Sequence, residues 1–142
     1  MNKTITIFAF FTLCFFNSNA QLKLNDFDDA QIYFNGIFDE NSQIDDYGNV
    51  LIDMGSATAG RYLFRITDVN IKMEERKEEP GCADICPPRV LIHFTCRKSE
   101  CISDPSFESE YNQSGVIIFE DTNRGKKAYA FLVALKEFMK NN

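Results

Sequence analysis

The spacing of apolar residues near the start of the chain favours a helix. Between Leu22 and Phe38, apolar side chains recur every three or four positions, at Phe27, Ala30, Phe34, Ile37 and Phe38. Asn25 or Asp26 can cap such a helix at its first turn. Gly36 and the β-favouring run 32–34 leave a strand open as the alternative.

From Asn49 onward the period of the pattern changes to two. Alternating apolar residues predict half-buried strands at 50–54, 62–66, 69–73 and 89–97, and the short connections between the first three favour antiparallel pairing. The run 74–81 is predicted to be a charged loop tip, and Ile102 begins a short return strand. Residues 115–120 are apolar on both faces, which is typical of a central or covered strand.

The end of the chain predicts an amphipathic helix. Ala128, Phe131, Leu132, Leu135, Phe138 and Met139 form one apolar stripe, and Thr122 or Asn123 can cap the start. The predicted fold class is therefore α+β: an antiparallel meander of five to seven short strands, as a bent sheet or partly open barrel, closed by a C-terminal helix.

This order of elements resembles the pleckstrin-homology-like architecture. In detail, the segments 90–101, 115–120 and 127–135 are similar to small uncharacterised exported proteins of Bacteroidetes-type bacteria, a resemblance that implies no activity. Phosphoinositide-binding members of the pleckstrin-homology group need a basic loop between their first two strands, and 55–60 carries no charge here. We therefore expect no phosphoinositide membrane binding.

The first twenty residues have the layout of a secretory signal peptide. Lys3 precedes an apolar run from Ile5 to Phe16, and the small residues up to Ala20 form a cleavage site. We expect residues 1–20 to be removed and 21–142 to form one domain, which is exported to the periplasm or secreted. That domain has 14 Lys and Arg against 21 Asp and Glu, a net charge of −7. Such a balance disfavours nucleic acid as a partner.

Four cysteines remain after the signal peptide: Cys82, Cys86, Cys96 and Cys101. An even number in an exported domain favours two disulfides, and three pairings are possible. A bond across the short turn between Cys96 and Cys101 is the easiest, which leaves Cys82 with Cys86; a four-thiolate zinc site is the weaker alternative. The segment from Pro80 to Pro88 is a candidate rigid recognition loop, with Pro80, Gly81, Asp84, Ile85, Pro87 and Pro88 as candidate contacts.

Candidate catalytic chemistry is sparse. His93 is the single histidine and has no evident partner in the sequence, and helix capping explains Asp26, Asp28 and Asp29 better than calcium binding does. A calcium loop from Asp39, Asn41, Asp45 and Asp46 is a weaker alternative to a solvated turn. No catalytic residue, metal or cofactor is predicted. The favoured function is a non-catalytic binding domain for a protein or small ligand; the alternatives are a carrier of a small apolar ligand and a carboxylate-based hydrolase.

Overall fold

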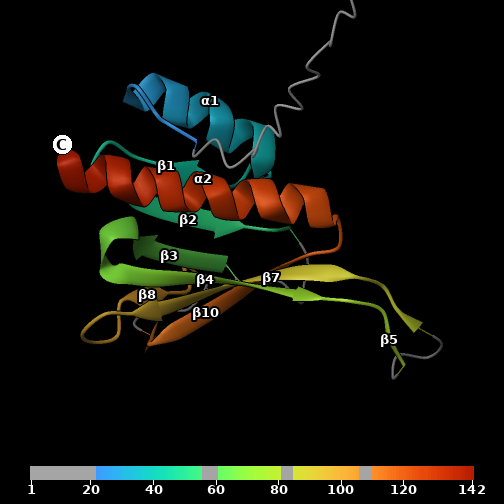
Figure 1. The fold of residues 1–142 in the computed structure, drawn as a ribbon. Coiled ribbons are helices and arrows are strands. Elements are labelled where there is room, and N and C mark those ends of the chain that lie inside the picture. The colour runs from blue at the N-terminus through green and yellow to red at the C-terminus, as the bar shows by residue number, and fades with distance from the viewer. Residues whose placement is uncertain (1–21, 56–60, 81–84, 106–109) are drawn as a thin grey trace, which may run out of the picture.

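The computed structural model describes residues 22–55, 61–80, 85–105 and 110–142 (Figure 1). The predicted signal peptide lies outside this part of the chain. The elements in chain order are α1 (Phe27–Ile37), β1 (Gln43–Ile44), β2 (Asn49–Asp53), β3 (Arg61–Arg65), a 3-10 turn η1 (Ile66–Asp68), β4 (Val69–Arg76), β5 (Glu79–Pro80), β6 (Ile85–Cys86), β7 (Arg89–Cys96), β8 (Ile102–Ser103), β9 (Tyr111–Asn112), β10 (Ser114–Phe119) and α2 (Thr122–Asn141).

The described strands form two main sheets and one small ribbon. Their orders are β1-β2-β3-β8-β9, β10-β7-β4 and β5-β6, with every pairing antiparallel, and none of the described sheets closes into a barrel. The predicted α+β class is confirmed. The strands divide between two antiparallel sheets, because β3 and β4 belong to different sheets. The buried side chain of Ile66 and the hydrogen bond from its N–H to the Gly48 carbonyl (2.8 Å) hold η1, where the chain leaves the first sheet.

Both helices begin at an aspartate cap. Asp26 accepts a hydrogen bond from the Asp29 N–H, which confirms the helical alternative for the first segment. Asp121 accepts from the N–H groups of Asn123 and Arg124, so the predicted caps of α2, Thr122 or Asn123, are wrong by one or two residues. No helix in the described residues is long and apolar enough to span a membrane.

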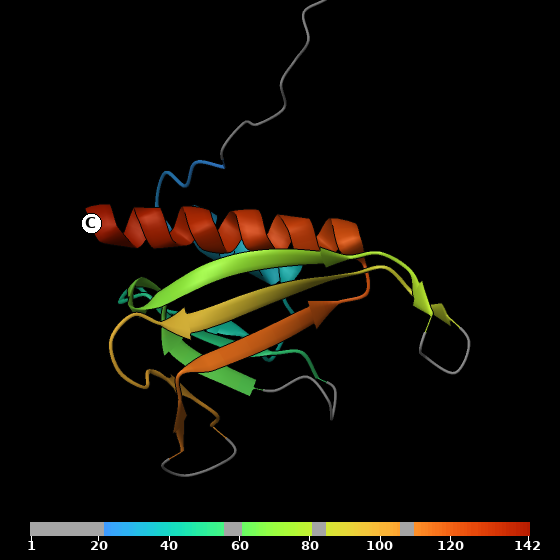
Figure 2. The same ribbon diagram turned by 60° about the horizontal axis from the view of Figure 1, so that its bottom comes forward.

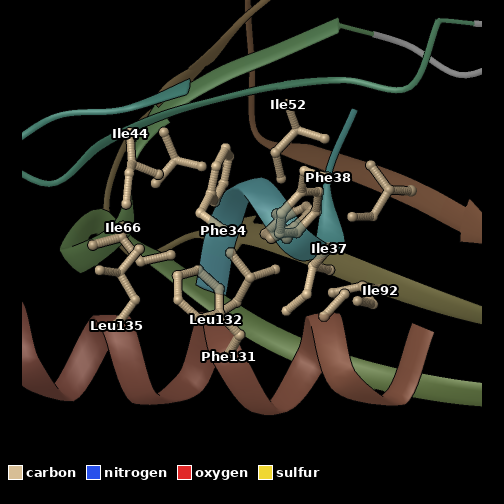
Figure 3. Close-up of a cluster of buried hydrophobic side chains, with 14 of the residues drawn as sticks. Phe34, Ile37, Phe38, Ile44, Ile52, Ile66, Ile92, Phe131, Leu132 and Leu135 are labelled. Atoms are coloured by element: carbon tan, nitrogen blue, oxygen red, sulfur yellow. The ribbon is translucent and has the colours of Figure 1, made fainter. Parts of the chain in front are cut away.

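The core lies between the two sheets and the two helices. Phe34 of α1 and Phe131 of α2 are buried with Ile92 of β7 in the cluster of Figure 3. The rings of Phe64 and Phe94 lie 4.7 Å apart and join β3 to β7, which places the first sheet against the second. We call the face of the β10-β7-β4 sheet that carries Phe94 the inner face, and the opposite face the outer face.

Two strand predictions need correction. The strand at 114–119 is not central: β10 ends the order β10-β7-β4, and Ile118 on its outer face is 42% exposed. The predicted charged loop tip at 74–81 is too long, because β4 continues to Arg76, which is paired with Arg89 of β7. The full-length pairing of β4 with β7 overrides the low β-propensity of this charged run.

Candidate functional site: the arm and the outer sheet face

The hairpin of β4 and β7 extends beyond the body of the molecule. After Arg76 and before Arg89 the chain continues in the ribbon of β5 and β6, in which Glu79 is paired with Cys86. We call the described residues 77–80 and 85–88 the arm. Figure 2 shows it projecting past the end of α2 and past both sheets. An extension with this geometry is available to a partner without any change in the core.

The predicted recognition residues lie on the arm, but the structure describes only part of them. Pro80 and Ile85 belong to the paired backbone of the ribbon, and Pro87 and Pro88 are exposed. Gly81 and Asp84 lie outside the described residues, as does Cys82. Cys86 is disulfide-bonded and 8% exposed. Prolines fix the backbone of their segment, so contacts made here lose little conformational entropy.

The outer face carries both apolar and charged side chains, and it continues from the body toward the arm. The registers of the sheet place one set of side chains there: Asn70, Lys72, Glu74 and Arg76 from β4, Arg89, Leu91, His93 and Thr95 from β7, and Ser114, Val116 and Ile118 from β10. Apolar residues lie on the β10 side and charged residues on the β4 side. A surface with an apolar strip beside a polar rim is suited to protein contact.

His93 lies at the centre of this face and has a partner that the sequence did not reveal. Its Nε2 lies 3.0 Å from Oε2 of Glu74, and Arg76 Nε donates to Oε1 of the same carboxylate at 2.7 Å. These hydrogen bonds, the one from Arg76 first, hold the pKa of Glu74 below its ordinary value. The sequence alone does not reveal this contact, because it depends on the strand register that places Glu74 diagonally across from His93. The cluster is ionic and half-exposed, which suits recognition of a polar group.

The predicted disulfide between Cys96 and Cys101 is confirmed. Their Cα atoms lie 5.7 Å apart, and the Cys101 N–H donates to Cys96 Sγ at 2.9 Å. Cys96 ends β7 and Cys101 precedes β8, so the bond ties the three-stranded sheet to the five-stranded one. The alternative of a four-thiolate zinc site, which needs both of these thiols free, is therefore wrong.

Three of the carboxylates considered as calcium ligands have structural partners. Asp39 pairs with Arg124 at 2.7 Å, and Asp45 accepts hydrogen bonds from the N–H groups of Tyr47 and Asn49 in the turn between β1 and β2. Asp26 caps α1. Within the described ranges, no three His, Cys, Asp or Glu side chains gather in a way that could hold a metal ion.

The geometry gives little support to a ligand cavity or to paired catalytic carboxyls. A carrier would line its cavity with phenylalanine side chains. Three of them, Phe34, Phe94 and Phe131, are at most 1% exposed and pack into the core. In the described part of the chain Ser42 is the one buried polar or charged residue, so none of the described carboxyls is buried. A glycosidase-type acid needs a raised pKa. Among the described residues, the carboxyls whose pKa is shifted, Asp45, Glu74 and Glu137, all have it lowered.

A scan against protein-family models, a search of curated proteins and a search of solved structures each found no match to this chain.

Proposed function

We propose that this protein is a non-catalytic, exported binding domain that contacts a partner protein through the arm and the outer face of the β10-β7-β4 sheet. The observation that carries the proposal is the continuity of the two surfaces: the strands that form the outer face, β4 and β7, are the same strands that continue into the arm. A partner lying along them meets the exposed Pro87 and Pro88 first and the His93 cluster next.

Export is part of the same proposal. The signal-peptide pattern in the first twenty residues, the disulfide between Cys96 and Cys101, and the disulfide-bonded state of Cys86 all support an oxidising compartment. The resemblance to exported bacterial proteins and to the pleckstrin-homology-like order of elements remains a prediction. It adds no ligand to the proposal, because fold likeness alone does not specify function.

Site-specific crosslinking tests the proposal. A photo-reactive amino acid is placed at Pro88 on the arm, at Thr95 on the outer face, or at Lys127, an exposed position on α2 that serves as the control. In cells that export the full chain, we expect one discrete adduct with another protein from the first two positions and none from Lys127. The adduct mass separates a different protein from a second copy of this chain.

The captured protein must then bind the purified domain. We expect the double substitution Pro87→Ala and Pro88→Ala, which leaves the core untouched, to weaken that binding at least tenfold, whereas Lys127→Ala leaves it unchanged. The proposal is wrong if Pro88 and Thr95 form no adduct, if Lys127 forms the same adduct, or if the double variant binds as the native chain does.

A further inference from the structure

The strand β10 has an open edge. It is the last strand in the order β10-β7-β4, and within the described residues no strand is paired with its other side. Its sequence, Ser-Gly-Val-Ile-Ile-Phe, contains no charged residue and no proline. Folded proteins normally protect such edges with charges, prolines or a covering element, because an uncovered edge pairs with other strands.

The direction of the backbone groups on β10 follows from one hydrogen bond. The Cys96 N–H donates to the Gln113 carbonyl at 2.8 Å, so these two residues form a hydrogen-bonded pair. Such pairs alternate along an antiparallel ladder. Gly115, Ile117 and Phe119 therefore direct their N–H and C=O groups toward β7, and Ser114, Val116 and Ile118 direct theirs outward from the sheet.

The opposite edge of the same sheet is protected. β4 contains four charged residues, Lys72, Glu74, Glu75 and Arg76. The helix α2 runs along this side, as Figure 2 shows, and the Lys136 ammonium donates to the Val69 carbonyl. Lys126 of the same helix pairs with Glu75 at 2.9 Å. The β4 edge thus has the features that prevent strand addition, and the β10 edge lacks them.

We propose that the open edge is completed by β10 of a second copy of this chain, paired antiparallel across a two-fold axis at Val116. In this register Val116 faces Val116 of the second copy, and Ser114 faces Ile118. All three outward residues of each strand then find partners. The two three-stranded sheets become one six-stranded sheet whose outer faces are continuous.

Charge and symmetry favour a second copy in this orientation. The negative charges next to β10, Glu120 and Asp121, lie at one end of the strand only. Antiparallel pairing places the acidic end of each β10 beside the uncharged start of the other β10 at Ser114, whereas parallel pairing would place the two acidic ends together. Because each copy offers one open edge of this sheet, the two-fold contact closes at a dimer.

An engineered disulfide tests the register directly. Residues that form a hydrogen-bonded antiparallel pair have Cα atoms about 5.5 Å apart, within the range for a disulfide. We expect purified Val116→Cys to form a crosslinked dimer on a non-reducing gel. Ile118→Cys is the matched control, because its two copies lie four residues out of register, roughly 13 Å along the strand. Equal crosslinking of both variants, or none of Val116→Cys, would overturn the proposal.

Sedimentation equilibrium of the purified exported protein gives a second reading. We expect concentration-dependent dimers, at least tenfold weaker in Val116→Lys, where two ammonium groups would face each other. Asn70→Lys, at an exposed site on β4, should leave the dimer unchanged, and circular dichroism checks that both variants fold. A native chain that stays monomeric at every concentration contradicts the dimer. That result would leave the crosslinking test of the partner surface unaffected, since a different protein could still bind there.

Discussion

The two faces of the β10-β7-β4 sheet are built from alternating residues of the same strands, yet they differ sharply in burial. On β7, Ile92 and Phe94 of the inner face are fully buried, whereas on the outer face Leu91 is 6% exposed, His93 is half-buried and Thr95 is exposed. The inner face is occupied by α2 and by the ring of Phe64 from β3. Packing therefore determines the residues of the inner face, whereas His93 and Thr95 on the outer face remain accessible to solvent.

Truncating a large inner-face side chain should have the largest effect. Phe94→Ala removes a fully buried ring that contacts Phe64 at 4.7 Å, and we expect a loss of about 3–5 kcal/mol in the free energy of unfolding. Thr95→Ala, the next residue on the outer face, should cost less than about 1 kcal/mol. Urea denaturation of both variants measures the difference. Similar costs for the two would show that the faces do not differ in packing.

Substitutions of two glycines, one in each helix, test how closely the helices pack against their neighbours. A Cβ on Gly125 of α2 would lie 2.6 Å from the Cβ of Val90, an inner-face residue of β7, whereas a Cβ on Gly36 of α1 would meet nothing within 4 Å. Gly125→Ala should therefore destabilise the fold by about 1–3 kcal/mol despite the higher helix propensity of alanine. Gly36→Ala should stabilise it by about 0.5–1 kcal/mol.

Thermal unfolding of the two glycine variants checks this pair of predictions. We expect the melting temperature to fall for Gly125→Ala and to rise for Gly36→Ala. A rise for both would mean that α2 can move away from β7 at little cost, and that the close approach at Val90 is not a constraint on the fold.

The sequence predicted the local elements better than their assembly. The apolar stripe of α2 and the alternation around Ile92 appear directly in the pattern, because each reports the burial of one face of one element. The division into two sheets does not appear, since it depends on η1, whose hydrogen bond to Gly48 joins residues far apart in the chain. For the same reason the pattern predicts a central or covered strand at 115–120: its apolar residues report burial of its inner face, not the number of its neighbouring strands.

The candidate site was partly predictable. The cysteine spacing correctly identified the bond between Cys96 and Cys101, because a five-residue separation across a turn allows few alternatives. The proline-rich segment was identified as a recognition loop, but its position on an arm required the register of β4 with β7. That register also creates the contact between His93 and Glu74. Contacts across a ladder depend on pairing, which a single sequence does not specify.

Acid should affect the two faces differently, although the effect is the smallest of those considered. The hydrogen bonds from Arg76 and His93 hold the pKa of Glu74 below its ordinary value of 4.5, so the folded chain binds this proton less readily than the unfolded chain. The contribution of Glu74 is therefore complete above the unfolded pKa and is lost as the pH falls through the folded pKa. The group is solvent-exposed, so the contribution is small.

The variant Glu74→Gln, compared with the native chain by urea denaturation at pH 7 and at pH 3, measures this contribution. We expect a small destabilisation at pH 7 that is smaller at pH 3, because the contribution of the native carboxylate is lost as the pH falls through its folded pKa. Phe94→Ala is the matched control on the inner face, because it removes no titratable group and its cost should be the same at both pH values. If Glu74→Gln had the same effect at both, its loss would reflect packing on the outer face, and the division between a packed inner face and an ionic outer face would not hold.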